Sequence, residues 1–223
     1  MLVGGDYAER IEGRWHERAV NSLIIRPSLA PHGDRVGAVG ARFLNVEVSD
    51  ALLPGRSDLP RPLAEWAVIR APDVVALGWK ILRELHAGSD GDSMVLEGYI
   101  AALMAAFTTE TDARTPPAWL ARALDMLHDS AVTPPGLDAL ARECGVHPAH
   151  FTRVFRRHLG QTVGTYVRAL RLSAAMQRLA RGRATMASAG LDAGFHDESH
   201  FSRTMRAVTG LTPGRYRRLM AAV

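Results

Sequence analysis

Arginine is the chemically active side chain that this sequence uses most, and its distribution is uneven. Of the 27 lysine and arginine residues, only Lys80 is a lysine. Residues 118–223 hold 15 arginines against 7 acidic residues, a net of +8, whereas residues 1–117 hold 12 basic and 16 acidic residues, a net of −4. A basic half suits a polyanion, because each neutralised phosphate releases condensed counterions. A generally arginine-rich proteome explains the choice of arginine over lysine, but it does not explain this asymmetry.

The other candidate chemical groups are few and scattered. His16, His32 and Asp34 are of types that bind metal ions, but the chain has no His-x-His pair, so polar loop residues are the simpler interpretation. The single cysteine, Cys144, excludes a disulfide within one chain and any multi-cysteine metal site, and it is typical of a small buried hydrophobe in a reducing cytosol. No phosphate-binding glycine loop, nucleophile elbow or local catalytic motif is present. We therefore expect no metal, no cofactor and no enzyme.

Length and composition are those of an ordinary globular protein. The 223 residues are enough for two modest domains, with 47% hydrophobic and 22% charged residues. The N-terminus has no apolar signal region, and no later stretch approaches 18 uninterrupted apolar residues. We therefore expect a soluble, cytoplasmic protein without a membrane partner.

Two segments of the basic half share one plan. In LDALARECGVHPAHFTRVFRRHLG, residues 137–160, a helix ends at Cys144, Gly145 makes a turn, and a new helix begins at Pro148. In MASAGLDAGFHDESHFSRTMRAVTG, residues 186–210, Gly194 makes the turn and the next helix begins near Asp197. Glycine supplies the positive φ that such a turn needs. The pattern predicts two helix-turn-helix units, an architecture whose second helix enters the major groove of DNA.

The two units also present corresponding apolar faces, and a helix joins them. The predicted inward residues are Leu137, Leu140, Ala141, Val146, Phe151 and Phe155 in the first unit, and Met186, Leu191, Phe195, Phe201 and Met205 in the second. Predicted helices cover residues 117–129, 136–144, 148–159, 162–181, 185–193, 197–209 and 213–221. The bridging helix is about 28 Å long at 1.5 Å per residue. That length approaches the roughly 34 Å between successive major-groove faces.

The first half of the chain changes period along its length. Short apolar runs punctuated by Gly and Pro predict strands over about 1–55. From Pro72, apolar residues at helical spacing predict one helix, with Val74, Leu77, Gly78, Ile81, Leu82 and Leu85 on its inner face. After a break at GSDGD, where Asp92 or Ser93 is a candidate cap, a second helix carries Leu96, Tyr99, Ile100, Leu103 and Phe107. Together they predict a helical hairpin over about 72–108, and the polar stretch before Pro116 and Pro117 predicts a domain boundary.

Residues 137–218 resemble the DNA-binding domain of the AraC/XylS family. The landmarks are LDALARECGV, FTRVFRRHLG, YVRALRL followed by Ala174, AGFHDESHFSRTMR and GLTPGRYRR. The resemblance implies a mainly α protein with a small N-terminal β region and a seven-helix DNA-binding domain over 118–223. It implies two helix-turn-helix units in neighbouring major grooves of double-stranded DNA, in a bacterial, nucleoid-associated regulator. An activator of this kind would have RNA polymerase as a further partner.

The family's contacts, carried over by position, fall on the second helix of each unit. The first would present Ala149, His150, Thr152 and Arg153, with Arg156 and Arg157 nearer the DNA backbone. The second would present Glu198, Ser199, His200 and Arg203, with Arg206 toward phosphate. Arginine pairs with both guanine acceptors, glutamate accepts from cytosine, and serine or threonine serves either base edges or phosphates. For each residue the alternative is a solvated helix face.

Two departures from the family pattern predict local weaknesses. His147 stands where relatives usually have a Ser-type N-cap, which predicts a cost of about 1 kcal/mol for the first unit. Ala189 and Gly190 stand where relatives usually have Ile-Ala. A glycine inside a helix costs about 1 kcal/mol, and the lost volume predicts a cavity in the second unit.

The N-terminal half resembles, over GDYAERIEGRWH and APHGDRVGAVGARFLNVEVS, a shortened cupin-like sensor domain. The resemblance divides the chain into a sensor and dimerisation domain at 1–110, a linker at 111–117 and the DNA-binding domain at 118–223, with a homodimer formed through the 72–108 helices. Three functions stay open: a regulator that responds to a small-molecule effector, an effector-independent regulator, and a cupin-type metal-dependent enzyme with a DNA-binding appendage.

Overall fold

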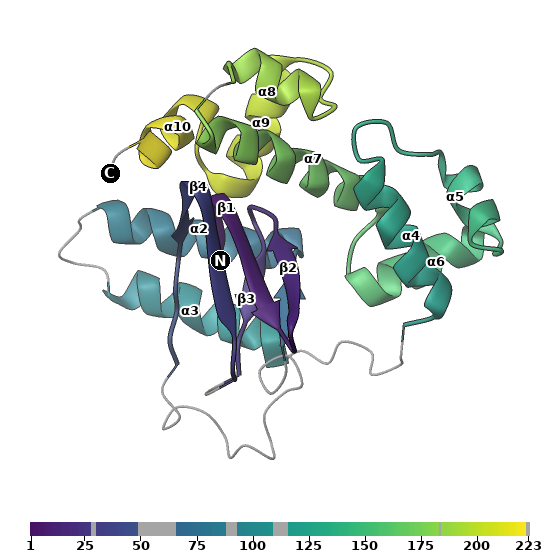
Figure 1. Cartoon of the computed structure of the whole chain (residues 1–223), viewed down its shortest axis with the longest axis horizontal. Helices are drawn as coiled ribbons and strands as arrows, with labels where there is room; N and C mark the ends of the chain where they lie inside the picture. Colours follow the sequence, from purple (N-terminus) through teal and green to yellow (C-terminus); the bar gives the residue numbers. More distant parts are fainter. Residues whose placement is uncertain (28–29, 49–65, 88–92, 109–115, 183, 222–223) are drawn as a thin grey trace.

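The computed structural model describes residues 1–27, 30–48, 66–87, 93–108, 116–182 and 184–221. Within these residues all the strands precede all the helices along the chain (Figure 1). The predicted fold class, mainly α with a small N-terminal β region, is confirmed. No described helix combines the length and the apolar character that crossing a bilayer requires.

Two small antiparallel sheets make up the part of the β region that the structure describes. The larger has the order β2-β1-β4 and consists of β1 (Leu2–Ile11), β2 (Arg14–Arg18) and β4 (Gly33–Phe43). The smaller pairs β3 (Leu23–Ile25) with β5 (Ala67–Ile69). Between β1 and β2, Glu12 and Gly13 both have positive φ, 49° and 81°, which is the two-residue hairpin turn that matches strand twist. The end of the predicted strand region falls within residues 49–65, which lie outside the described residues.

The predicted helical hairpin is present as α2 (Pro72–Ala87) and α3 (Ser93–Thr108), and the candidate caps lie outside the described side chains. The inner face of α2 is rotated from the predicted one. Leu85 is 55% exposed, whereas Trp79, which the apolar count omitted, is fully buried. The reason is that α2 buries a second side against the C-terminal helices as well as one against α3, so its buried surface centres on Val75 and Trp79.

Seven helices fill the described C-terminal part of the chain, each within two residues of its predicted bounds. They are α4 (Ala118–Asp129), α5 (Leu137–Glu143), α6 (Pro148–Leu159), α7 (Val163–Ala180), α8 (Met186–Asp192), α9 (Glu198–Thr209) and α10 (Pro213–Ala221). Two predicted inward residues are wrong, because Leu137 is 39% and Leu191 51% exposed. Leu191 is the counterpart of the exposed Arg142 when the turn glycines are aligned, so the internal repeat itself marks it as a surface position.

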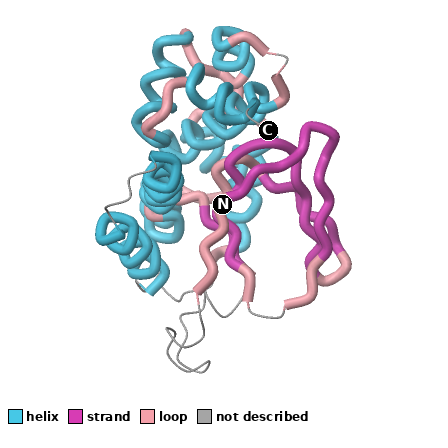
Figure 2. Tube along the Cα trace, turned by 90° about the vertical axis from the view of Figure 1, so that its left-hand side faces the viewer, coloured by secondary structure: helices cyan, strands magenta, loops and turns pink. Residues whose placement is uncertain are grey.

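The described residues form two hydrophobic cores, and the division between them does not follow the predicted domain boundary. One core joins α4, α5 and α6 to the first half of α7, around Leu120, Phe151 and Phe155. The other joins the β region, α2 and α3 to the second half of α7 and to α8, α9 and α10, around Trp79 and Tyr216. Figure 1 shows α7 crossing above the sheet from one group to the other, and Figure 2 shows the strands and the upper helices in contact. The second helix-turn-helix pair therefore shares its core with the N-terminal half of the chain.

Candidate nucleic-acid interface

The two helix-turn-helix pairs are built alike. In each, a helix of 7 residues is followed by a turn and a helix of 12 residues. The turn glycines Gly145 and Gly194 have φ of 70° and 89°, and the second helices both end on a left-handed glycine, Gly160 and Gly210. A glycine there satisfies the last helical carbonyls without Cβ strain. The second turn is one residue longer, because α6 begins three residues after its glycine and α9 begins four after its own.

Different side chains cap the two second helices. The Nδ1 atom of His147 accepts from the amide of Ala149 at 3.3 Å, so an imidazole takes the place of the expected hydroxyl and Pro148 fixes the first turn. Asp197 accepts from the amide of His200 at 2.6 Å, and this hydrogen bond holds the pKa of Asp197 below its ordinary value. The sequence predicts that the first unit lacks an N-cap at His147. This prediction is wrong: His147 supplies the cap, through a longer hydrogen bond than that of Asp197.

Gly190 is closely packed, although the sequence predicts a cavity in the second unit. A Cβ atom on Gly190 would lie 3.0 Å from Cβ of Phe201 and 3.2 Å from its ring, so α8 and α9 approach closely there. Ala189 and Phe201 are both fully buried. The glycine therefore permits a closer helix crossing, where the smaller volume had predicted empty space.

All eleven residues predicted to contact DNA lie on α6 or α9, and ten of them are exposed. The structure brings them together as two separate groups, Ala149, His150, Thr152, Arg153, Arg156 and Arg157 on α6, and Glu198, Ser199, His200, Arg203 and Arg206 on α9. His200 is half-buried, with its ring 5.3 Å from that of Phe195. On α6, Arg153 lies 3.3 Å from the Nδ1 atom of His150, and the hydroxyl of Thr152 donates to the carbonyl of Pro148. The hydroxyl proton of Thr152 is therefore bonded within α6.

Helix α7 connects the two groups, and its middle contacts the loop after α4. Its 18 residues span about 27 Å at 1.5 Å per residue. Arg171 on α7 donates to the carbonyls of Ala131 and Val132, at 2.8 and 2.9 Å, and a Cβ on Gly194 would lie 2.8 Å from the same Val132 carbonyl. The loop after α4 therefore touches the turn of the second pair, which ties the two pairs to each other.

A further repeat, which the sequence-based prediction omitted, follows each pair and anchors it to another part of the molecule. The segments GQTVGTY and GLTPGRY follow α6 and α9 at the same spacing and place Tyr166 and Tyr216 equivalently. The Tyr166 hydroxyl lies 2.9 Å from Nε2 of His128 on α4, whereas the Tyr216 hydroxyl donates to the carbonyl of Val3 on β1 at 2.8 Å. Burial raises the pKa of both tyrosines. The repeated glycine, threonine and tyrosine were visible in the sequence as a signal.

The candidate metal ligands of the N-terminal half do not form a metal site. His16 lies on β2, while His32 lies 3.8 Å from Asp34. The described residues contain no group of three or more histidine, cysteine or acidic side chains arranged to hold an ion. Asp34 instead belongs to a hydrogen-bonded network in which Arg26 contacts Tyr7 and Asp34, and also the fully buried Glu9 at 2.7 Å.

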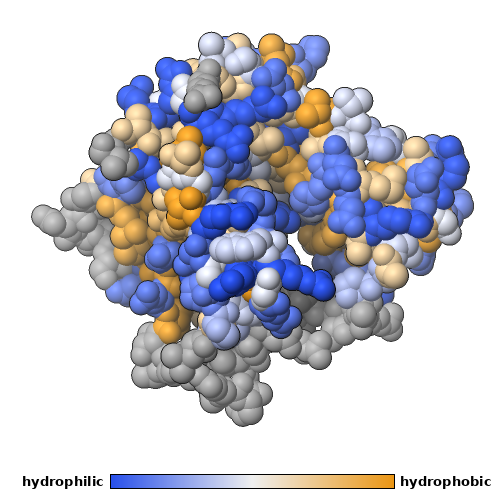
Figure 3. All heavy atoms as spheres, viewed as in Figure 1, coloured by the Kyte–Doolittle hydropathy of each residue, from blue (hydrophilic) through white to orange (hydrophobic). Residues whose placement is uncertain are grey.

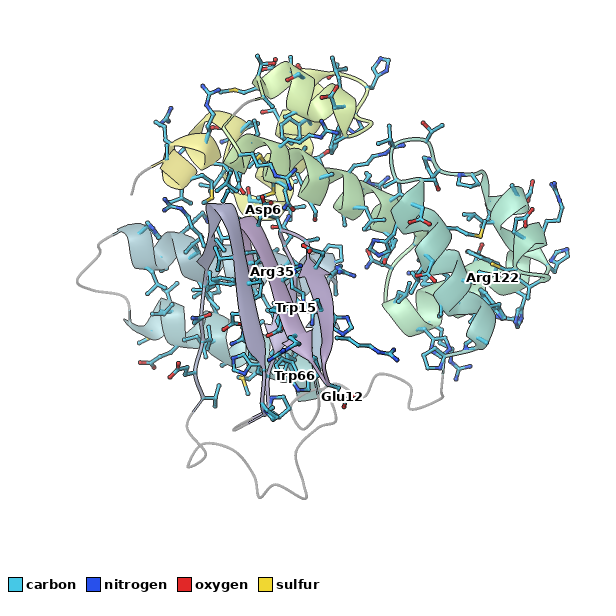
Figure 4. All side chains as sticks on the ribbon, in the orientation of Figure 1. Asp6, Glu12, Trp15, Arg35, Trp66 and Arg122 are labelled. Carbon is cyan, nitrogen blue, oxygen red and sulfur yellow. The ribbon has the colours of Figure 1, made fainter. Side chains whose placement is uncertain are left out.

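A second polar contact lies at the end of the sheet next to α7. Asp6 is found there in Figure 4, at the opposite end of the strands from Glu12, while Trp15 and Arg35 lie between them on the sheet. Asp6 accepts from Arg181 at 2.8 Å and from Gln177 at 2.6 Å. Burial raises the pKa of Asp6, but these hydrogen bonds and the arginine charge outweigh it, so the pKa lies below its ordinary value. The contact joins β1 to the second half of α7.

Comparison with known proteins singles out the same segment. A family model described as a helix-turn-helix domain matches residues 140–219. An HTH-type transcriptional regulator of Mycobacterium tuberculosis is 32% identical over 82 residues, which cover 37% of this chain and 32% of that protein. The HTH-type transcriptional activator RhaR of Escherichia coli is 28% identical over 100 residues, covering 45% of this chain and 36% of that protein. The matched segment thus spans about a third of these relatives.

A solved structure is similar over the same region. It is a transcriptional regulator from Chromobacterium violaceum, described among AraC-type DNA-binding domain-containing proteins, and it is 30% identical. The match covers 47% of this chain and 93% of that chain, with a TM-score of 0.45. The printed descriptions of these three proteins are those of transcriptional regulators.

Proposed function

Because the C-terminal half of the chain belongs to the AraC/XylS family of helix-turn-helix domains, we propose that the protein is a sequence-specific DNA-binding transcription regulator whose α6 and α9 enter successive major grooves. The observation that carries the proposal is the repetition of one helix-turn-helix plan on a single connecting helix, with the predicted contact residues outward on both copies. The span of α7, about 27 Å, is close to the roughly 34 Å between successive groove faces.

We assign base reading and phosphate contact to different residues. Arg153 and Arg203 occupy equivalent positions in the middle of α6 and α9, where a guanidinium reaches the two acceptors of guanine. Arg156, Arg157 and Arg206 lie in the last turns and suit phosphates, which position a protein without reading sequence. Glu198 in the first turn of α9 would accept from cytosine.

The proposal includes a homodimer formed through α3. This helix has a single charged residue, Glu97, which lies at the edge of an exposed side whose other residues are uncharged. Met94 is 81% exposed, and Gly98, Ala101, Ala102 and Ala105 continue the same stripe at helical spacing. We propose a second copy of the chain as the partner on this face, because small residues let two such helices approach closely. A dimer would present four DNA-contacting helices, two from each copy.

The proposal has three further parts. The protein acts in the cytoplasm at the nucleoid, RNA polymerase is its partner if it is an activator, and a small-molecule effector controls it. An effector-independent regulator is the alternative.

Salt-dependent binding to genomic DNA fragments tests the proposal. Fluorescence anisotropy should give an affinity that falls linearly, on logarithmic axes, with salt concentration. Arg153→Ala should cost about 1–3 kcal/mol on the preferred fragment and relax its base preference at one position. Arg157→Ala should weaken all fragments alike and make the salt slope shallower.

The matched control is Arg35→Ala, which removes an exposed arginine that pairs with Glu17 on the sheet. It should leave the affinity unchanged. An equal loss of DNA affinity in the Arg35 and Arg153 variants would show that binding depends only on net charge. It would overturn the assignment of α6 as a helix that reads DNA.

A further inference from the structure

Arg171 lies on α7 at the point where this helix passes from one hydrophobic core to the other. Val167, before it, packs in the core of the first helix-turn-helix pair, and Leu172, after it, packs in the core that contains the second pair. The guanidinium donates from Nε to the carbonyl of Ala131 at 2.8 Å and from Nη2 to the carbonyl of Val132 at 2.9 Å. These two hydrogen bonds, the Arg171 contact, join α7 to the loop after α4.

The loop that accepts these hydrogen bonds is itself fixed to the first pair. It begins at Ser130, whose amide donates to the carbonyl of Met126 in the last turn of α4 at 3.1 Å, and whose hydroxyl donates to the same carbonyl. Pro134 and Pro135 follow, and each proline ring fixes one φ angle of the loop. Helix α4 packs in the first core. The Arg171 contact therefore holds α7 to α4 through a short, restrained loop.

The turn of the second pair meets the same atoms. Gly194, the turn glycine, has φ of 89°, and a Cβ atom placed on it would lie 2.8 Å from the carbonyl oxygen of Val132 and 3.0 Å from Nε of Arg171. A glycine leaves room for this approach, which a side chain would obstruct. Three segments thus meet at one point: the loop after α4, the middle of α7 and the turn between α8 and α9.

The internal repeat indicates that a helix-turn-helix pair forms without such an arginine. Arg171 follows Tyr166 by five residues, and the residue that follows Tyr216 by five is Ala221. The second pair nevertheless has helices of the same lengths as the first. A role between the two pairs therefore fits Arg171 better than a role within one of them.

The geometry of the contact suits it to fix an orientation. A long helix bends and curves by itself, whereas a planar guanidinium that meets two acceptors at once restrains direction as well as distance, and its charge strengthens both hydrogen bonds. On the face shown in Figure 3, the surface is hollowed between the strands and the α4–α6 helices, below α7 in Figure 1, so the sheet does not brace the first pair on this side.

We propose that Arg171 is a positioning residue for DNA recognition: its contact holds α6 and α9 in one relative orientation and thereby sets the spacing between the two DNA blocks that the protein accepts. The inference rests on the proposed function and deepens it, because it names the residue that determines which block spacing is bound.

Spin-label distances in the free full chain test the orientation without DNA. The labels are attached at Arg156→Cys on α6 and Arg206→Cys on α9, two exposed and equivalent positions, in a Cys144→Ser background. Pulsed electron paramagnetic resonance should give one narrow distance distribution in this parent protein. Adding Arg171→Ala should broaden the distribution, because α7 alone then joins the two pairs at this point.

The spacing of the DNA site tests the consequence. The two blocks of the preferred site are moved together or apart by one base pair, which turns one block by about 35° relative to the other. The ratio of affinities for the native and the shifted site should be at least about tenfold in the wild type, the loss of one bidentate base contact, and less than about threefold in Arg171→Ala. A general loss of stability would lower both affinities and leave this ratio unchanged.

Two further variants separate the contact from charge and from α7 in general. Arg171→Lys keeps the positive charge but loses the planar fork, so it should behave like Arg171→Ala in both measurements. It also replaces Arg171→Ala if that variant does not fold. Arg178→Ala is the matched control, because this exposed α7 arginine pairs with Asp192 on α8 at 2.9 Å, within the second pair. It should keep the narrow distribution and the wild-type ratio.

An unchanged distance distribution or an unchanged spacing ratio in the Arg171 variants would overturn the inference, and so would an equal change in Arg178→Ala. Broadened distances in a chain that binds no DNA would refute the proposed function and leave the structural role of the Arg171 contact standing. DNA binding with the wild-type spacing ratio in the Arg171 variants would refute this inference alone.

Discussion

The two helix-turn-helix pairs have the same backbone plan but different support. Tyr166 holds the first pair to α4 through His128, and Phe151 and Phe155 complete a core that belongs to the C-terminal half alone. Tyr216, its counterpart, holds the second pair to Val3 on β1, and its ring lies 6.1 Å from that of Trp79 on α2. The two pairs therefore depend on different parts of the molecule. The N-terminal half contacts the second pair directly, whereas its contacts reach the core of the first pair through α7.

The second helices of the two pairs, α6 and α9, also differ in charge. Helix α6 has three arginines and no acidic residue, whereas α9 has two arginines together with Glu198 and follows the capping Asp197. Arg157 has no counterpart on α9, where the equivalent residue is Ala207. Each arginine near phosphate adds sequence-independent affinity. If the protein binds DNA as proposed, α6 should contribute more of the affinity than α9, and changes in the N-terminal half should affect α9 more than α6.

Removing the N-terminal half should have the largest effect. A fragment of residues 116–223 keeps the whole first core but loses every partner that β1, α2 and α3 give to the second. Hydrogen exchange followed by mass spectrometry should show protection kept in α4–α6 and lost in α8–α10, because exposed apolar core surface is no longer covered. Equal protection in both pairs would show that the second pair folds independently and would break the comparison.

Matched truncations in the two cores should be next in size. Trp79→Ala and Phe155→Ala each remove a fully buried aromatic side chain, so each should lower the free energy of unfolding by about 3–5 kcal/mol. Trp79→Ala should raise exchange mainly in the sheet and α8–α10, and Phe155→Ala mainly in α4–α6. The same regional pattern in both variants would mean that the molecule unfolds as one unit.

Adding a methyl group at the second helix crossing should have a smaller effect. Gly190→Ala brings a Cβ to 3.0 Å from Phe201, whereas the first pair already carries Ala141 at the equivalent position. Overpacking costs about 1–3 kcal/mol, and the gain in helix propensity offsets about 1 kcal/mol. Urea denaturation should show a net loss of about 1 kcal/mol. A stabilised variant would mean that the α8–α9 crossing can open without cost.

Acidification should have the smallest effect on the free energy of unfolding, and it should act through His128, which supports the first pair. Burial and the charge of Arg70 hold the pKa of His128 below its ordinary 6.5, so the unfolded chain binds a proton more readily than the folded one. The stability that neutral His128 contributes is complete above about pH 6.5 and is lost as the pH falls below it. The effect is small, because the side chain is partly exposed. Urea titrations at pH 7.5 and 5.5 should show a pH-dependent difference between the wild type and His128→Gln; parallel curves would exclude this group.

Much of the fold follows from local signals. The turn glycines, Pro72 and the 3.6-residue spacing located the helices, since each acts within a few residues. The shared core could not be predicted, because the contacts of Tyr216 with Val3 and of Asn21 with Trp79 join distant segments through ordinary apolar and amide groups. The prediction of a cavity at Gly190 is wrong for a similar reason, since residue volume alone does not give the distance between two helices.

Selection from random double-stranded DNA by the purified full chain tests most directly whether both helix-turn-helix pairs read DNA. We expect a preferred site with two blocks about one helical turn, roughly 10 base pairs, apart. We further expect that Arg153→Ala relaxes one block and Arg203→Ala the other. A single short block, unaffected by Arg203→Ala, would contradict tandem reading and leave α6 as the sole reader.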